Sequence, residues 1–162
     1  MNGHSHEYDV TVTWTGNTGP GTAGYTAYSR DHEVSVATGA PTISGSSDPS
    51  FRGDPARWNP EQLLVTSLSQ CHMLWYLHLA STAGVVVTAY EDHPHGVMVT
   101  NSSGAGQFEA VTLRPRVTIT AASDPEVALR LHADVPALCF IARSVNFPVG
   151  HEPEIVVEGA AG

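Results

Sequence analysis

One long helix signature, from Asn59 to Gly84, constrains this chain more than any other feature of its sequence. Asn59 is a favoured N-cap residue, and Pro60 suits the first helical position because the amide proton that it lacks is not needed there. Glu61 places an acid near the positive end of the helix dipole, and Gln62 completes a capping box. The start of a helix is therefore well specified.

Apolar residues recur along this helix at spacings of three and four, so they share one broad face. The face comprises Leu63, Leu64, Leu68, Cys71, Trp75 and His78 or Leu79. Gly84 ends the run as a C-cap glycine does, and the predicted helix over residues 60–83 is about 36 Å long. It is too rich in Gln, His and Ser for a membrane span. The sequence thus predicts a core helix with Cys71 near its middle.

Charge and composition exclude several kinds of partner. The 162 residues carry a net charge of −9, and all seven basic residues are arginine. No basic patch is available for nucleic acid or for an anionic membrane. The polar first ten residues show no signal peptide or spanning segment, which predicts a cytoplasmic protein. The length is that of one domain, residues 1–162, and the two cysteines are either inert core thiols or a redox pair.

Short strands and one long loop are predicted before the helix. Alternation favours strands over residues 8–15, 25–29 and 33–37. Residues 39–58 are dominated by Gly, Pro, Ser and Asp, so they are expected to form a long loop. Loops of that length in compact domains are commonly functional or mobile.

After the helix, strands are predicted over residues 85–92, 96–102, 108–121 and 154–158. Pro115 predicts an edge position or a bulge in the third of them, because proline cannot donate to a sheet ladder. A second helix begins with Ser123 or Asp124 as its cap. Pro136 is expected to break or kink it, so that residues 137–144 form an offset helical piece with Cys139. This order of elements predicts an α+β fold with two long helices against antiparallel sheet.

Several motifs together resemble the OsmC/Ohr family of thiol peroxidases. They are the run NPEQLL, Cys71 ten residues after Glu61 in an aromatic-rich helix, the strand VTLRPRV, and Cys139 within ALCFIARSVNFPV. The resemblance spans nearly the whole chain. It implies a single OsmC-like domain, with antiparallel sheets wrapped around two long central helices in an intertwined homodimer. It also implies that the active sites lie at the subunit interface.

The same resemblance implies reduction of organic hydroperoxides in oxidative stress defence. In that scheme Cys71 attacks the peroxide and becomes a sulfenic acid, and Cys139 resolves it as a disulfide. A dithiol reductant, either a lipoylated protein or a small thiol, regenerates the protein, and no cofactor is involved. Phe140 follows Cys139 where the better-characterised branches tend to have proline. That places the chain among the OsmC-like proteins with a CFIA-type ending.

A peroxidatic thiol reacts as a thiolate, and apolar surroundings raise a thiol pKa, so a cation is required near Cys71. Arginine suits this role because it stays charged and its planar fork can address thiolate and peroxide oxygens. The family resemblance gives Glu61 the task of holding that arginine. Arg30 resembles the position used by the Ohr branch and is slightly favoured. Arg52 resembles the region used by the OsmC branch and stays an alternative.

Helix geometry separates Glu61 from Cys71. Ten helical positions place them roughly 15 Å apart along a straight helix and about 80° apart around it. They cannot touch on one continuous helix. Either the chain bends after Glu61, or Glu61 serves the Cys71 of a neighbouring subunit.

Further side chains are candidates for the site. The candidates for an apolar peroxide pocket are Trp75, Met73, Phe51 and Trp58, residue types that also fill ordinary cores. No metal is expected, because none of the nine histidines forms an HExxH motif or a Cys/His ligand set. His72 is a candidate to tune Cys71, although adjacent helical residues point about 100° apart.

A second function class stays open from the sequence. It is a non-enzymatic OsmC-like dimer that binds a small apolar ligand at the subunit interface, with thiols that are structural or weakly redox-active. Cys139 discriminates between the two classes. A resolving thiol must approach Cys71 closely, with α-carbons within roughly 7 Å.

Overall fold

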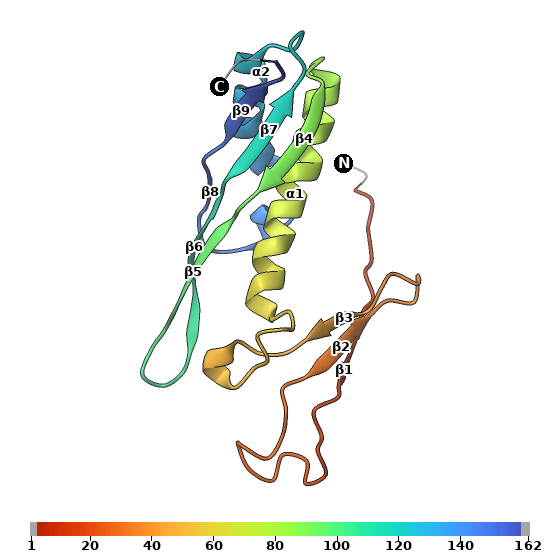
Figure 1. Cartoon of the computed structure of the whole chain (residues 1–162), viewed down its shortest axis with the longest axis vertical. Coiled ribbons are helices and arrows are strands. Elements are labelled where there is room, and N and C mark those ends of the chain that lie inside the picture. Colours follow the sequence, from red (N-terminus) through yellow and green to blue (C-terminus); the bar gives the residue numbers. More distant parts are fainter. Residues whose placement is uncertain (1–2, 160–162) are drawn as a thin grey trace. The chain divides into compact units, whose positions relative to one another are not determined.

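A computed structural model describes residues 3–159 of the chain. The chain forms two compact units that divide between Leu63 and Leu64. Each unit is described by itself below, with the element labels of Figure 1.

The amino-terminal unit contains an antiparallel sheet with the order β1-β2-β3. Its strands are β1 (Thr11–Trp14), β2 (His32–Ser35) and β3 (Ile43–Gly45), followed by the 3-10 helix η1 (Pro49–Phe51). The strand predicted over residues 25–29 is wrong. Turn hydrogen bonds hold that segment instead, including one from the Arg30 guanidinium to the Tyr25 carbonyl oxygen. Both β3 and η1 lie within the predicted long loop.

Helix α1 (Pro60–Thr82) has 23 residues and ends one residue before the predicted boundary. The predicted capping box is confirmed. The Gln62 amide donates to Asn59 Oδ1 at 2.8 Å, and the Asn59 amide donates to Gln62 Oε1 at 3.0 Å. Gly84 has a φ of 73°, the left-handed conformation that favours glycine after a helix. α1 is continuous through Glu61 and Cys71.

The buried face of α1 differs from the predicted one. Its buried residues are Leu68, His72, Tyr76 and Ala80, one position later than the predicted Cys71 and Trp75. Two of these are polar, and each has a partner inside the core. His72 Nε2 lies 2.9 Å from His132 Nδ1, and the Tyr76 hydroxyl donates to the Ala128 carbonyl oxygen at 3.0 Å. Paired polar groups can be buried, so hydrophobic spacing alone misplaced this face.

The carboxy-terminal unit contains two three-stranded sheets, ordered β4-β7-β9 and β5-β6-β8. The strands are β4 (Val87–Asp92), β5 (His95–Thr100), β6 (Gly106–Leu113), β7 (Pro115–Ile119), β8 (Val149–His151) and β9 (Glu154–Val157). The pairs β6–β8 and β7–β9 are parallel, so the expectation of purely antiparallel sheets is wrong. The chain returns through the second helix before β8 and β9 form, which permits this direction. Figure 1 shows α1 alongside β4 and β7.

Helix α2 (Pro125–Asp134) has 10 residues, so the expected second long helix is shorter than predicted. Asp124 is its cap, and Oδ1 of Asp124 accepts from the Glu126 amide at 2.8 Å. Pro136 ends the helix as predicted, within the 3-10 turn η2 (Val135–Ala137). The offset helical piece predicted over residues 137–144 is reduced to this turn and η3 (Ala142–Ser144).

The core of this unit gathers around α1, α2 and β7. Its larger cluster contains Tyr76, Ala80, Val85, Val117, Ile119, Ala128, Val135 and Cys139. A smaller cluster joins Leu68 to Val111 and Leu113 on β6. Cys139 belongs to the larger cluster and is thus a core residue.

Within residues 3–159, no helix is both long enough and apolar enough to cross a bilayer.

Candidate active site

Cys71 lines a pocket of about 520 Å³ in the carboxy-terminal unit. α1 and the segment after α2 form its wall, which consists of Ser67, Gln70, Cys71, Leu74, Trp75, His78, Phe140 and Ile141. The Trp75 and Phe140 rings pack edge to face with centroids 5.6 Å apart. The wall is mostly apolar, and Cys71 is partly exposed. An apolar ligand that entered this pocket would meet the Cys71 thiol.

Cys139 lies beside Cys71 and belongs to the core. It is 2% exposed, and Cys71 packs against the cluster that contains it. Burial raises the pKa of Cys139 to about 11, and the neighbouring Cys71 thiol is the second largest cause of this shift. Cys139 Sγ accepts a hydrogen bond from the Ala142 amide at 3.4 Å, and both cysteines are free thiols. The structure thus brings together the two cysteines that the sequence singled out.

Three histidine rings, those of His72, His132 and His151, lie close together in the carboxy-terminal unit. His72 and His151 line a small cavity together with Cys139. The His132 ring stacks on Tyr76 with centroids 3.9 Å apart, and it lies nearly parallel to the His72 ring, at an interplanar angle of 11°. Burial lowers the pKa of His72 to about 4 and that of His132 to about 3, so both rings are neutral at pH 7. Within residues 3–159, no three His, Cys, Asp or Glu side chains are grouped as a metal site.

Sequence reasoning missed His132 and His151, because neither lies in a motif and each is far from Cys71 along the chain. His72 had been considered only as a neighbour of Cys71. Its side chain instead belongs to the buried face of α1.

In the amino-terminal unit, both candidate arginines lie near Tyr25. The Arg30 guanidinium donates to the carbonyl oxygens of Tyr28 and Tyr25 at 2.7 Å each. Its Cζ lies 4.0 Å from the Tyr28 ring centroid and 4.5 Å from that of Tyr25. Arg52 Cζ lies 6.0 Å from the same Tyr25 ring. Among the described residues, neither arginine forms an ion pair with a carboxylate.

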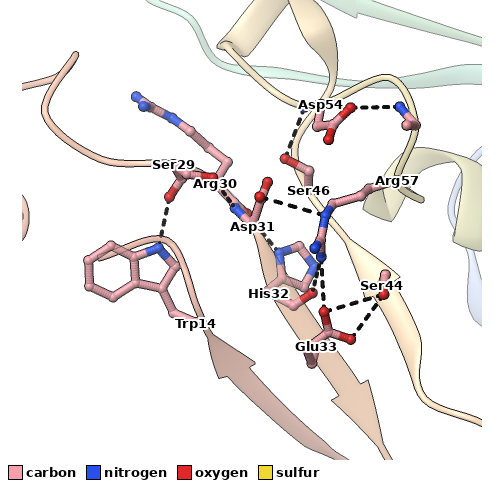
Figure 2. A network of polar contacts seen from close by, with 11 residues as sticks. Trp14, Ser29, Arg30, Asp31, His32, Glu33, Ser44, Ser46, Asp54 and Arg57 are labelled. Carbon is pink, nitrogen blue, oxygen red and sulfur yellow. Dashed lines mark hydrogen bonds and ion pairs between the residues drawn. The ribbon is translucent and has the colours of Figure 1, made fainter. Parts of the chain in front are cut away.

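Glu61 forms no ion pair within residues 3–159, and its Oε2 is buried there without a hydrogen-bond partner. A different arginine has carboxylate partners. Arg57 Nη1 lies 3.0 Å from Glu33 Oε1, and Arg57 Nε lies 3.6 Å from Asp31 Oδ2. Figure 2 shows this network, with Arg30 extending away from it. Sequence reasoning did not single out Arg57, although it stands two residues before the NPEQLL motif.

Of the predicted pocket residues, Trp75 lines the pocket beside Cys71. Met73 lies on α1 outside this lining. Phe51 and Trp58 belong to the amino-terminal unit, where Trp58 and Arg57 line a smaller cavity of about 170 Å³. Their place in a peroxide pocket stays a prediction. Six lining residues were not among the predicted pocket residues. Four follow one face of α1 at spacings of three and four, namely Ser67, Gln70, Leu74 and His78, and the other two are Phe140 and Ile141 after α2.

Comparison with known proteins identifies the family. Residues 53–154 match the family model described as OsmC-like protein. An OsmC-like protein of unknown function from Vibrio cholerae is 31% identical, with 92% of this chain and 99% of that chain covered and a TM-score of 0.79. An organic hydroperoxide resistance protein from Legionella pneumophila shares the fold at 14% identity, with coverages of 94% and 100% and a TM-score of 0.66.

Another organic hydroperoxide resistance protein, from Elizabethkingia anophelis, shares the fold at 15% identity, with coverages of 96% and 100% and a TM-score of 0.65. Among curated protein sequences, none matches this chain significantly. The family model covers more than half of the 162 residues. The chain therefore belongs to the OsmC-like protein family.

Proposed function

We propose that this protein is a Cys-based thiol peroxidase that reduces organic hydroperoxides. The observation that carries the proposal is the placement of two free thiols side by side, with Cys71 in the wall of an apolar pocket and Cys139 in the core. Two solved relatives are named organic hydroperoxide resistance proteins, which agrees with this chemistry.

In the first step the Cys71 thiolate attacks the terminal oxygen of the hydroperoxide, the one that carries the hydrogen. A sulfur–oxygen bond forms, the oxygen–oxygen bond breaks, and the alkoxide leaves with a proton as an alcohol. Cys71 is oxidised to a sulfenic acid while the peroxide is reduced. The apolar wall, including Trp75 and Phe140, favours peroxides with an apolar body over hydrogen peroxide.

In the second step the Cys139 thiolate attacks Cys71 Sγ. A disulfide forms, the sulfur–oxygen bond breaks, and the hydroxide leaves with a proton as water. A dithiol, either a lipoylated protein or a small thiol, then restores both thiols by disulfide exchange. The whole cycle requires no bound cofactor.

The thiolate of Cys71 requires a cation, and the proposed one is an arginine from a second copy of the chain in a homodimer. Glu61 and Cys71 lie ten positions apart on one continuous helix, about 15 Å along its axis. Glu61 therefore serves the Cys71 of the partner and orients an arginine there. Its buried Oε2 has no partner among the described residues, which leaves it available for this contact. Arg30 is the favoured arginine and Arg52 the alternative.

A second candidate function is the binding of a small apolar ligand without catalysis. It is favoured by the raised pKa of Cys139, which keeps this thiol protonated, and by the exposed apolar side chains of Leu74 and Phe140 at the pocket. In that case the thiols would be structural or weakly redox-active.

Steady-state consumption of cumene hydroperoxide with dithiothreitol or a lipoylated protein as reductant separates these functions. A peroxidase consumes many equivalents of peroxide, and it consumes cumene hydroperoxide faster than hydrogen peroxide. A binding protein consumes no more than the buffer. Its tryptophan fluorescence still responds to an apolar ligand, because Trp75 lines the pocket.

A further inference from the structure

We propose that Cys139 has a second role in the reduced protein, in which its thiol donates a hydrogen bond to the Cys71 thiolate and stabilises it from the core side. This inference rests on the proposed peroxidase function, which requires Cys71 as a thiolate. The resolving role of Cys139 begins only once Cys71 is oxidised. The donor role precedes it and acts on the first step.

Hydrogen bonds on both sides fix the backbone of Cys139. Its amide donates to the Val135 carbonyl oxygen at 2.9 Å, and its carbonyl oxygen accepts from the Arg143 amide at 3.1 Å. Cys71 lies on the continuous helix α1 and packs against the core cluster that contains Cys139. Each thiol thus extends from a hydrogen-bonded segment, so the contact between them does not depend on a flexible loop.

The Cys139 thiol has one proton to donate and few groups that can accept it. Its Sγ already accepts a hydrogen bond from the Ala142 amide at 3.4 Å. At 2% exposure the side chain has little access to water. The backbone at Ile141 and Ala142 acts on this thiol as a donor, and the Cys71 side chain is its other hydrogen-bond partner. The S–H group of Cys139 is therefore directed to Cys71 Sγ.

The titration of Cys139 agrees with this direction. Burial is the largest cause of its raised pKa, and the hydrogen bond with Cys71 is the next. A hydrogen bond to a neighbouring acceptor raises the pKa of the donor, because it favours the protonated form. The negative charge of an ionised Cys71 raises the pKa of Cys139 further. Cys139 is thus the partner that keeps its proton, and Cys71 is the partner that can lose it.

Among the residues that line the two cavities, the other titratable groups are histidines. They are His78 in the Cys71 pocket, and His72 and His151 in the small cavity that Cys139 also lines. Burial lowers the pKa of His72 to about 4 and that of the neighbouring His132 to about 3. Both rings are neutral at pH 7 and supply no positive charge to a thiolate. From the core side the Cys139 thiol is therefore the donor.

The donor role also orders the two steps of the reaction. Burial and the Cys71 thiolate together keep Cys139 protonated, and a thiol is a poor nucleophile. Attack on a peroxide converts the Cys71 thiolate into a sulfenic acid, so its sulfur loses the negative charge. The contribution of that charge to the raised pKa of Cys139 then ends, while burial remains. Cys139 becomes easier to ionise at the point where Cys71 must be resolved.

Two variants of nearly equal size separate this hydrogen bond from packing. Cys139→Ala removes the donor, whereas Cys139→Ser keeps a hydroxyl donor whose oxygen can still accept from the Ala142 amide. Alkylation of Cys71 by iodoacetamide is followed from pH 5 to pH 10 with peptide mapping, because only the thiolate reacts. Cys139→Ala is expected to move the pH midpoint of alkylation upward and to slow the reaction at least threefold below the wild-type midpoint. Cys139→Ser is expected to stay within twofold of the wild type.

Equal midpoints in Cys139→Ala and the wild type overturn the proposal. An equal upward shift in both variants also overturns it, since that result would assign the effect to packing. The wild type supplies a test without any substitution. Raman spectroscopy records the S–H stretching band of Cys139 above the pH midpoint of Cys71, and again after Cys71 is alkylated. Loss of the thiolate acceptor is expected to move this band to higher wavenumber, and an unchanged band overturns the proposal.

Failure of the underlying function gives a different result. If the wild type consumes no more cumene hydroperoxide than the buffer while Cys139→Ala still moves the alkylation midpoint, the donor role holds and the peroxidase function is wrong. If the wild type consumes peroxide and Cys139→Ala leaves the midpoint unchanged, the peroxidase function stands and the donor role is wrong.

Discussion

Cys139 contacts Cys71 from within the core, so two neighbouring thiols occupy different surroundings. Cys71 lines an open apolar pocket of about 520 Å³, whereas Cys139 is 2% exposed. In the proposed mechanism a peroxide therefore reaches Cys71 first, and Cys139 stays shielded until Cys71 becomes a sulfenic acid. We infer the separate roles of the two thiols from this asymmetry.

The first prediction concerns the separate roles of the cysteines in a single turnover. Cys71→Ser is expected to consume no cumene hydroperoxide. Cys139→Ser is expected to consume one equivalent and to stop at a Cys71 sulfenic acid that dimedone traps. Residual peroxide and adduct mass are measured over time. Consumption of peroxide by Cys71→Ser at the wild-type rate would contradict the assignment.

The second prediction concerns acid stability. The folded state holds the pKa of His72 near 4 and that of His132 near 3, below the ordinary 6.5. The unfolded chain therefore binds more protons below pH 6.5, so the free energy of unfolding falls as the pH falls from 6.5 toward 3. At pH 5 the loss is about 2–4 kcal/mol for the coupled pair. Urea unfolding at pH 7.5, 6 and 5 measures it.

His132→Phe isolates this contribution, because a phenyl ring still stacks on Tyr76 but does not titrate. The variant is expected to be less stable than the wild type at pH 7.5, with a smaller loss between pH 7.5 and pH 5. His95→Gln, at an exposed position, is expected to keep the wild-type pH dependence. Equal losses in His132→Phe and the wild type would contradict the lowered pKa of His132.

The third prediction concerns the capping box of α1. Asn59→Ala removes the acceptor of the Gln62 amide and is expected to lower the free energy of unfolding by about 1 kcal/mol. Because the two side chains bond reciprocally, Asn59→Ala and Gln62→Ala are expected to cost less together than the sum of their separate effects. Urea unfolding of both single variants and the double variant measures this coupling, and strict additivity would contradict it.

The sequence predicted α1 closely because its boundaries depend on local chemistry. Asn59, Pro60 and Gln62 specify the start, and Gly84 specifies the end, without help from the rest of the fold. It did not predict which face of α1 is buried. His72 and Tyr76 are buried because His132 and the Ala128 carbonyl group meet them, and these partners lie more than fifty residues away.

The errors in the predicted strands also come from contacts that the local sequence pattern does not show. β8 has three residues, too few for alternation to be visible, and it exists because β6 offers a parallel edge. The segment over residues 25–29 has strand-like residues, but Arg30 bonds to the carbonyl oxygens of Tyr25 and Tyr28 and holds it in turns. Motifs predicted both cysteines, whereas the histidines behind Cys139 lie in no motif and became visible only in the folded chain.

The fourth prediction concerns the arginine that activates Cys71. Arg30→Met is expected to slow sulfenic acid formation at least tenfold, since the thiolate would lose its cation. Arg57→Met is expected to leave this rate unchanged, because Arg57 is engaged with Asp31 and Glu33. The rate of formation of the dimedone-trapped product is compared at pH 7 in these two variants and in Arg52→Met. A large effect in Arg52→Met and none in Arg30→Met would transfer the role to Arg52.

The most direct measurement of the central claim is stoichiometric oxidation of the reduced protein by cumene hydroperoxide and by hydrogen peroxide. Intact mass and peptide mapping then identify the products at both cysteines. The proposed function predicts rapid formation of a Cys71–Cys139 disulfide, faster with the organic peroxide. Survival of both thiols in a modest excess of oxidant, or their slow and independent modification, would contradict it.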